Sequence, residues 1–402
     1  MQVDILASKA FGCIKAPASK SMAHRLLICA ALSEGKSVVS GISDSEDMLA
    51  TLDCIRALGG DVEVDGDVVS ICGVDPLRTV PKFALGCRES GSTLRFMLPI
   101  ALLCGEYVEL VASDALMKRP MGVFESLCKE HEYFYKQEKN SITIKGPLKS
   151  SEYTVVGNVS SQFISGLLFA LPLLDSDSTL RILPPVESRS YIELTLSALR
   201  EFGVDVSWTD ENTLYIKGGQ RYCAHDCTVE GDYSNAAFLD AFNLFGGNVN
   251  VLGLDENSIQ GDKVYKEYFK LLENQTPTIN IGNCPDLGPI LFAVAAAKKG
   301  GTFTGTGRLR IKESDRAAAM AQELSKFGTH VVVKEDTVTI TPKEFHAPTE
   351  AIFGHNDHRI VMATSVLLTL TGGSITDAQA VRKSFPNFFD CLKKLNVSVT
   401  TY

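Results

Sequence analysis

The chain repeats one pattern of hydrophobic and polar positions six times. Each copy is an apolar, alanine-rich stretch of helix length that ends in a glycine-containing turn and continues into a short strand. Successive copies start about 52 to 73 residues apart, and four of the five intervals are close to 70 residues. This regularity predicts a fold built from six similar units, which begin at Ser19, Ser90, Ser160, Tyr233, Pro285 and His355.

A second and more polar helix pattern follows the first, and a pair of short strands follows it. The repeating unit is therefore predicted to be βαβαββ. The first helix of each unit is apolar nearly all round, which indicates burial, whereas the second is amphipathic and is expected outside. We predict an α/β (α+β) fold in which sheets enclose buried helices. The second helix and its strand pair are visible at residues 47–71, 120–144, 191–216 and 314–340.

Six units of about 65 residues are too many for one hydrophobic core, so we predict two similar domains of three units each. The strand predicted at residues 2–6 precedes the first unit and has to join a sheet. Pairing it with the last units makes one domain discontinuous, and two chain crossings allow a hinge that closes over a cleft. We expect the active site in that cleft, between a domain of residues 1–16 and 229–402 and a domain of residues 17–228.

Composition places the chain in the soluble globular class. It has 402 residues, of which 45% are hydrophobic and 22% are charged. Its longest apolar stretches, at residues 96–104 and 164–174, are shorter than the roughly 18 residues of a membrane span. The N-terminus has an acid at Asp4 and no signal-peptide pattern, so we expect a cytoplasmic protein. The net charge of −9 argues against a nucleic-acid partner.

The eleven cysteines form no CxxC pair and lie mostly in apolar segments, which predicts buried free thiols. Only Cys223 and Cys227 approach the spacing of metal ligands. No second Cys or His pair follows to complete a zinc site, so we predict no metal.

Basic residues stand where the predicted helices begin. The helix macrodipole leaves partial positive charge at that end, so cations there are unfavourable unless an anion binds. A single lysine or arginine of this kind is most simply a surface charge, but its recurrence predicts phosphate or carboxylate ligands and a polyanionic substrate pair. One predicted helix begins without a charge, at Ser160, Ser161 and Gln162. This triplet is either a helix N-cap or a phosphate-binding site. The basic residues are Lys20, Arg25, Arg95, Lys312, Arg316, Arg359 and Lys383.

Three acids share the expected neighbourhood of the ligand. Asp286 follows Pro285 at a helix start, and Glu313 and Asp315 lie inside the basic segment RLRIKESDR. Asp286 has the alternative role of a helix cap, and Glu313 that of a salt-bridge partner of a neighbouring arginine. Carboxylates beside cations stay ionised and can act as bases, while a lysine can donate a proton. No GxSxG, P-loop, strand-linked GxGxxG or HExxH motif is present.

The residues resemble the 5-enolpyruvylshikimate-3-phosphate synthases over essentially the whole chain. Any one of the shared segments is weak alone, but the ordered set is specific. The segments are APASKSMAHR, ESGSTLR, KRPMG, SSQF, SRSYIELTL and EGDYSNAAF, then PDLGP, RIKESDR, HNDHR and KSFPNFF. The resemblance implies the enolpyruvyl transferase fold, an inside-out α/β barrel in each domain. It also implies transfer of the enolpyruvyl group of phosphoenolpyruvate to the 5-hydroxyl of shikimate 3-phosphate, without cofactor or metal. We expect a monomer by default.

The resemblance also implies roles for individual residues. Lys20, Asp286 and Glu313 are implied to handle protons, with the base of each half-reaction undecided. Gln162 is implied to lie between the substrates, and Lys20 to touch both. For phosphoenolpyruvate the implied ligands are Lys20, Gly91, Arg95, Arg119, Gln162, Arg316, Arg359 and Lys383. For shikimate 3-phosphate they are Lys20, Ser21, Arg25, Ser160, Ser161, Gln162, Tyr191, Asp286 and Lys312.

Two positions depart from the pattern of better-known members. An Asn-Ala-Gly triplet often stands where this chain has Glu89, Ser90 and Gly91, and an Asn where it has Arg308. Glu89 and Arg308 are therefore left without a role. Gly91 retains the close backbone approach that a phosphate loop needs. Because inhibitor tolerance in this family is commonly altered at this glycine, its presence predicts sensitivity to glyphosate.

Three other interpretations remain. A sister enzyme transfers enolpyruvyl to a UDP-amino sugar, but it usually has Lys-Asn in place of Lys20-Ser21 and a reactive cysteine where residues 113–121 have none. A non-catalytic anion-binding protein on the same scaffold would not need the intact Lys20, Asp286 and Glu313. An RNA-end-processing protein would need a nucleotide site and a basic face, and neither is recognisable in the sequence.

Overall fold

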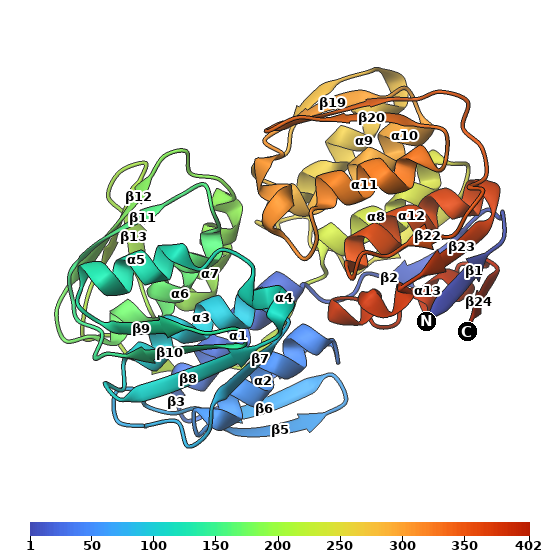
Figure 1. Cartoon of the computed structure of the whole chain (residues 1–402). Helices are drawn as coiled ribbons and strands as arrows, with labels where there is room; N and C mark the ends of the chain where they lie inside the picture. The colour runs from blue at the N-terminus through green and yellow to red at the C-terminus, as the bar shows by residue number, and fades with distance from the viewer. The chain divides into compact units, whose positions relative to one another are not determined.

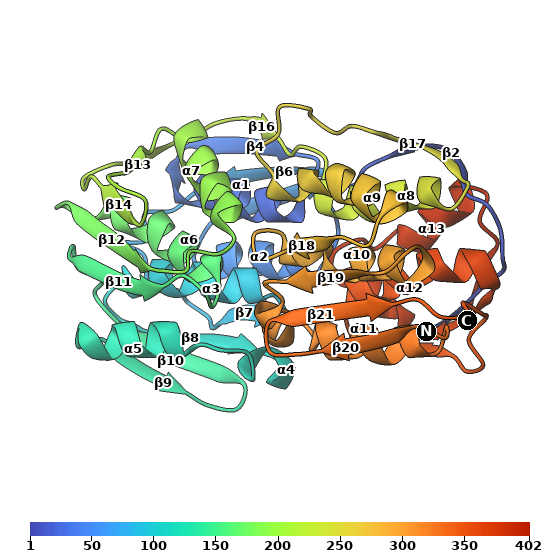
Figure 2. The same ribbon diagram turned by 90° about the horizontal axis from the view of Figure 1, so that it is seen from above.

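The computed structural model describes residues 1–402, which form two compact units. Unit 1 combines Met1–Ser19 with Glu230–Tyr402, and unit 2 is Lys20–Val229. The chain thus begins in unit 1, completes unit 2 without interruption, and returns. In both units the helices that open the repeats are buried (Figures 1 and 2).

The core of unit 2 is a group of three apolar helices, α1 (Lys20–Leu32), α3 (Gly91–Leu102) and α6 (Ser161–Ala170). Aromatic contacts join them. The Phe96 ring of α3 meets His24 of α1 edge-on, and it lies 5.3 Å from the Phe169 ring of α6. Because almost every position of these helices is apolar, each can be packed on all sides. The predicted burial of the first helices is confirmed.

Three four-stranded sheets of unit 2 share one topology, in which the first two strands are parallel and the remaining neighbours antiparallel. The first sheet is β16 (Cys227–Thr228), β4 (Lys36–Ser40), β6 (Val68–Cys72), β5 (Asp61–Asp65). The second is β7 (Leu85–Arg88), β8 (Tyr107–Ala112), β10 (Ser141–Lys145), β9 (Phe134–Gln137). The third is β11 (Glu152–Val156), β12 (Ser178–Leu183), β14 (Thr213–Ile216), β13 (Val206–Trp208).

The second helices of unit 2 are amphipathic, as predicted, and a few short elements complete the unit. The second helices are α2 (Glu46–Ala57), α5 (Gly122–Glu130) and α7 (Arg189–Glu201). The short elements are α4 (Asp114–Met117), η1 (Leu171–Leu173), and the strands β3 (Ser33–Glu34) and β15 (Tyr222–Cys223), which pair with each other.

Unit 1 repeats this architecture. Its buried helices are α8 (Tyr233–Leu244), α10 (Gly288–Ala297) and α12 (His358–Thr371), and the others are α9 (Tyr265–Asn274), α11 (Arg316–Ser325) and α13 (Phe388–Lys394). One sheet is β18 (Thr278–Asn280), β19 (Gly301–Thr304), β21 (Thr337–Thr341), β20 (His330–Val333). Another is β22 (Ile352–Phe353), β23 (Gly373–Thr376), β1 (Gln2–Ile5), β24 (Val399–Thr401). The 3-10 turns are η2 (Gly261–Val264), η3 (Pro285–Leu287), η4 (Gly307–Ile311) and η5 (Ala378–Lys383).

The N-terminal strand β1 lies inside the last sheet, antiparallel to both β23 and β24. It occupies the place that the final strand of a βαβαββ unit takes elsewhere. The expected pairing of this strand with the last unit is therefore confirmed.

The unit that contains α8 departs from the repeat. Its sheet has only two strands, β2 (Phe11–Lys15) and β17 (Asn248–Leu252), which pair in parallel. Helix α9 ends at Asn274 and β18 begins at Thr278, so three residues separate them and no strand pair fits there. This unit is βαβα rather than βαβαββ.

No helix has both the length and the apolar character needed to cross a membrane. The thiols are only partly as predicted, because six of the eleven are buried while Cys13, Cys72 and Cys223 are exposed. These three lie on short strands at positions that face away from the core.

Candidate active site

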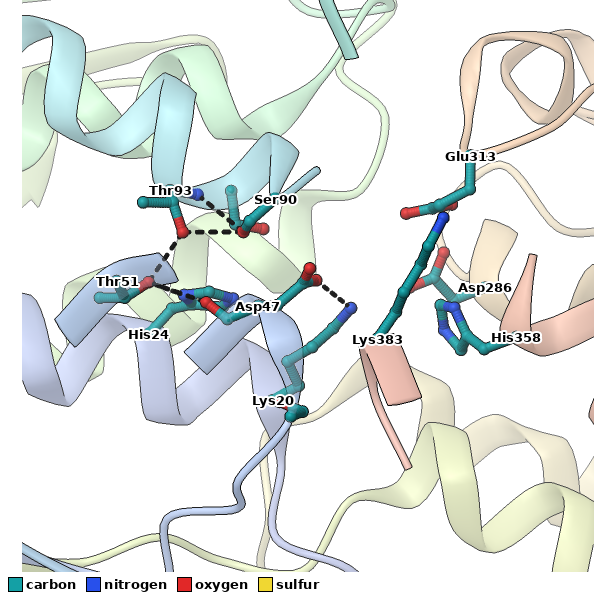
Figure 3. A network of polar contacts seen from close by, with 12 residues as sticks. Lys20, His24, Asp47, Thr51, Ser90, Thr93, Asp286, Glu313, His358 and Lys383 are labelled. Atoms are coloured by element: carbon teal, nitrogen blue, oxygen red, sulfur yellow. Dashed lines mark hydrogen bonds and ion pairs between the residues drawn. The ribbon is translucent and has the colours of Figure 1, made fainter. Parts of the chain in front are cut away.

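In unit 2 the first residue of α1, Lys20, forms an ion pair with Asp47 of α2. The Lys20 Nζ lies 2.8 Å from the Asp47 Oδ2, and both side chains are largely buried (Figure 3). The acid compensates a cation at a helix start, where the macrodipole is unfavourable. Asp47 was not among the predicted site residues, because an acid in the first turn of a helix is the ordinary pattern.

Arg25 lies one turn further along α1 and is fully buried, with its guanidinium 5.3 Å from the centre of the Phe96 ring. Its Nε donates to the Thr195 hydroxyl at 2.8 Å, and its Nη2 to the Tyr191 carbonyl at 2.8 Å. Its Nη1 donates to the Ser21 carbonyl at 2.6 Å. Burial lowers the pKa of Arg25 to about 10. Three predicted ligands of shikimate 3-phosphate are thus in direct contact.

A second group in unit 2 joins the starts of α3 and α6. The Arg95 Nη1 donates to the Gln162 Oε1 at 2.7 Å, and its Nη2 to the Pro120 carbonyl at 3.1 Å. The Gln162 amide in turn donates to the Ser92 hydroxyl at 2.8 Å. The buried Arg95 therefore holds Gln162 in one orientation, with the amide oxygen toward the guanidinium.

Gly91, the first residue of α3, lies against Arg119. A Cβ atom at Gly91 would be 2.9 Å from the Arg119 Nη1 and 3.1 Å from its Cζ. A guanidinium this close is possible only because the position has no side chain. The structure therefore brings together four predicted phosphoenolpyruvate ligands, which are Gly91, Arg95, Arg119 and Gln162.

Of the two serines that open α6, Ser160 is the helix cap. The Ser160 hydroxyl accepts from the Gln162 backbone N–H at 3.3 Å, and Ser161 is the buried first residue of the helix. A serine that sequence reasoning missed, Ser188, precedes α7 in a left-handed conformation with φ 56° and is buried. Its signal was the SRSY segment, in which only the tyrosine was singled out. Glu89 is partly exposed at the end of β7.

In unit 1 the Asp286 carboxylate lies among three cations. Its Oδ1 is 2.9 Å from the Arg316 Nη1 and 3.3 Å from the Lys312 Nζ, and its Oδ2 is 3.0 Å from the Arg359 Nη2. Glu313 pairs with the same arginine, with its Oε2 2.6 Å from the Arg316 Nη2. Figure 3 shows the Asp286 side chain, from η3, near that of Glu313. Five predicted site residues, counting Lys312, are therefore in contact.

Asp357 belongs to this charged group in unit 1, and sequence reasoning missed it. It is completely buried and accepts from the Arg316 Nε at 2.8 Å and from the Ser314 hydroxyl at 3.1 Å. Its Oδ1 also caps α12 by accepting from the Arg359 backbone N–H at 2.9 Å. One carboxylate thus aligns two arginines. The HNDHR segment carried this aspartate, but an acid before a helix was read only as part of the motif.

Burial lowers the pKa of Lys312 to about 8, although its pairing with Asp286 opposes the shift. Arg308 is also buried, and its positive charge contributes to lowering the pKa of Lys312. Lys383 donates from Nζ to the Asn356 carbonyl at 2.7 Å, on the turn before α12. The Asp315 side chain caps α11 by accepting from the Ala318 N–H at 3.0 Å.

Comparisons with known proteins identify the family of the chain and confirm its fold. Residues 7–392 match the family described as EPSP synthase (3-phosphoshikimate 1-carboxyvinyltransferase). The chain belongs to the EPSP synthase family. A 3-phosphoshikimate 1-carboxyvinyltransferase of Clostridium perfringens is 40% identical over 98% of both chains. Another of Clostridioides difficile is 37% identical over 97% of this chain and 96% of its own.

A solved EPSP synthase of Acinetobacter baumannii aligns with all of both chains at a TM-score of 0.79 and 26% identity. The predicted fold class is therefore confirmed. As a member of the EPSP synthase family, the chain is a transferase of the shikimate pathway in aromatic biosynthesis, with phosphoenolpyruvate and shikimate 3-phosphate as the family's substrates. The charged groups of both units contain lysine or arginine side chains.

Proposed function

We propose that the cationic groups of unit 1 and unit 2 act together on one pair of substrates. Phosphoenolpyruvate is bound by Lys20, Gly91, Arg95, Arg119, Gln162, Arg316, Arg359 and Lys383. Shikimate 3-phosphate is bound by Lys20, Ser21, Arg25, Ser160, Ser161, Gln162, Tyr191, Asp286 and Lys312. The observation that carries the proposal is the Asp286 carboxylate held by Lys312, Arg316 and Arg359, since it combines a base with three anion-binding cations.

The reaction proposed for this site is an addition followed by an elimination. A proton adds to carbon 3 of phosphoenolpyruvate while the 5-hydroxyl oxygen of shikimate 3-phosphate bonds to carbon 2 and loses its proton to a base. The tetrahedral intermediate then loses a proton from carbon 3, and the bond between carbon 2 and the phosphate oxygen breaks. The products are 5-enolpyruvylshikimate 3-phosphate and inorganic phosphate.

The charges of the side chains indicate which groups accept and which donate these protons. Asp286 and Glu313 both contact Arg316, and carboxylates beside a guanidinium stay ionised and can only accept a proton. The proton for carbon 3 must therefore come from a cationic acid, and Lys20 is the ammonium group proposed for that step. The arginines stabilise the charge that develops on the phosphate as it leaves.

The decisive experiment is phosphate release from phosphoenolpyruvate, with EDTA present throughout. Release that requires shikimate 3-phosphate supports the proposal. Release that requires UDP-N-acetylglucosamine instead would assign the site to the sister enzyme. Tight binding of both substrates without release would favour an anion-binding protein. Lys20→Met serves as the inactive variant, because it removes the ammonium group and should abolish phosphate release while leaving helix α1 in place.

We further propose that glyphosate inhibits the enzyme and that the enzyme is a monomer. Support for inhibition comes from Gly91, whose missing side chain leaves room for the Arg119 guanidinium. An inhibition curve that stays flat to millimolar glyphosate would contradict this. Light scattering after size-exclusion chromatography tests the monomer, for which the sequence gives a mass of 43.6 kDa.

A further inference from the structure

Four buried side chains in unit 2 form a continuous chain of hydrogen bonds. The His24 Nδ1 is 2.8 Å from the Thr51 hydroxyl, which is 2.8 Å from the Thr93 hydroxyl. The Thr93 hydroxyl donates to the Ser90 hydroxyl at 2.7 Å (Figure 3). None of the four side chains is more than 1% exposed. We call this group the His24 chain.

The protons in this chain run in one direction. A hydroxyl has one proton to donate, and that of Thr93 goes to Ser90. Thr93 must then accept from Thr51, and Thr51 must accept from the His24 Nδ1–H. His24 is neutral, because burial and the charges of Lys20 and Arg25 hold its pKa well below its usual range. Its Nε2 is then a bare acceptor in an apolar pocket beside Phe96.

The His24 end and the middle of the His24 chain each lie one helical turn from a group of the candidate site. His24 follows Lys20 by four residues on α1, and Thr51 follows Asp47 by four residues on α2. Residues at this spacing lie on the same face of a helix. The Thr51 hydroxyl also donates to the Asp47 carbonyl at 3.3 Å, so its one proton is shared between this carbonyl and the nearer Thr93 hydroxyl at 2.8 Å.

The other end of the His24 chain lies beside Gly91, in the turn from β7 to α3 (residues 89–91), which we call the Gly91 loop. Ser90 precedes Gly91 and caps α3 by accepting from the Thr93 N–H at 3.3 Å. Three helix starts that carry different ligand groups are therefore joined through side chains alone. The chain connects the Lys20–Asp47 ion pair to the Gly91 loop without including either.

We propose that His24, Thr51 and Thr93 are positioning residues that hold the Gly91 loop at a fixed distance from the Lys20–Asp47 pair, and so set the affinity for phosphoenolpyruvate. This inference rests on the proposed function of that loop. Its competitor is a purely structural role, in which the hydroxyls only satisfy each other's hydrogen bonds. That role would affect the stability of unit 2 without discriminating between the two substrates.

The test compares variants that break and restore the chain. Thr51→Val removes the hydroxyl at nearly constant volume, and Thr51→Ser restores it. His24→Leu removes the donor, and His24→Asn supplies an amide N–H near the position of Nδ1. The control is Ser33→Ala, which removes a buried hydroxyl just beyond the other end of α1, where Ser33 bonds to the Ala30 carbonyl.

The expected result is a split between the two Michaelis constants. Thr51→Val and His24→Leu should raise KM for phosphoenolpyruvate about tenfold, since one well-placed buried hydrogen bond is lost. KM for shikimate 3-phosphate should stay within about twofold. Thr51→Ser and His24→Asn should recover most of the loss. Ser33→Ala should lower the melting temperature without changing either constant.

Two results would overturn the proposal. One is an equal rise of both Michaelis constants, and the other is a lower melting temperature with both constants unchanged, as in Ser33→Ala. Calorimetric titration with phosphoenolpyruvate makes the same comparison without turnover. If the wild-type protein releases no phosphate, the proposed function fails, yet an unchanged phosphoenolpyruvate affinity in Thr51→Val would still reject the positioning role.

Discussion

Replacing Gly91 by alanine should weaken phosphoenolpyruvate binding without destabilising the fold. The added methyl group would lie 2.9 Å from the Arg119 Nη1, whereas ordinary contacts of this kind begin near 3.4 Å. The guanidinium must therefore move by about 0.5 Å or more. It is the far end of a flexible side chain, so this movement costs the protein little. Alanine is also a better helix former than glycine, which offsets part of the cost.

The functional loss follows from the displaced guanidinium. A hydrogen bond between charged groups contributes about 1.5 to 3 kcal/mol, and a shift of this size loses a large part of it. KM for phosphoenolpyruvate should therefore rise roughly 10- to 100-fold. The contacts proposed for shikimate 3-phosphate involve Arg25 and Ser160 instead, so its KM should change by less than about twofold.

Steady-state kinetics with each substrate varied in turn gives both constants. Gly122→Ala is the matched control, because Gly122 also opens a helix and a Cβ there would meet nothing within 4 Å. Gly91→Ala with an unchanged KM for phosphoenolpyruvate would refute the reasoning, and so would an equal effect of Gly122→Ala.

Three further predictions concern the other groups. Asp357→Asn removes the buried negative charge that pairs with Arg316. The free energy of unfolding should fall by about 2 to 3 kcal/mol, and the melting temperature by roughly 4 to 12 °C. A change of the melting temperature below about 1 °C in thermal unfolding would contradict this. Because burial lowers the pKa of Lys312 to about 8, this lysine is cationic below that pH, and kcat/KM for shikimate 3-phosphate should fall as the pH rises through about 8. Lys312→Arg should move this fall to higher pH. A profile of the wild-type protein that stays flat to about pH 10 would contradict the prediction. The single tryptophan, Trp208, has its ring centre 3.9 Å from the Cζ atom of Arg189, which opens α7, the helix that carries the predicted ligand Tyr191. Its fluorescence should therefore respond to shikimate 3-phosphate and not to phosphoenolpyruvate alone, and the absence of any response to saturating shikimate 3-phosphate would count against the assignment.

Much of the fold was predictable because its information is local. The buried helices are apolar at almost every position, and this shows in any stretch of a dozen residues. The prediction of a complete βαβαββ unit was wrong for the unit of α8, although the spacing held the signal. Its interval of about 52 residues is shorter than the others by the length of a strand pair, and the structure shows that the strand pair is the missing part.

The cations of the site and two of its acids, Asp286 and Glu313, were predictable, whereas the acids Asp47 and Asp357 were not. Arginine at the start of a helix conflicts with the macrodipole, so Arg316 and Arg359 attract attention in the sequence. Aspartate at the same place is favourable and common, so Asp47 and Asp357 look like ordinary caps. Their pairing with cations on other elements depends on tertiary packing, and sequence spacing carries no sign of it.

The position of β1 affects how the protein can be made. Residues Gln2 and Tyr402 bond to each other through two backbone hydrogen bonds, so the last sheet of unit 1 closes only when both ends of the chain are present. During synthesis, Lys20–Val229 is complete long before that, and unit 2 can fold while the ribosome still holds the rest. The pairing of β1 with β24 can form only after the final residues have been synthesised. The same adjacency makes the two termini a natural point for joining the ends, and a circular permutant opened at an exposed loop elsewhere would retain every strand pair of this sheet.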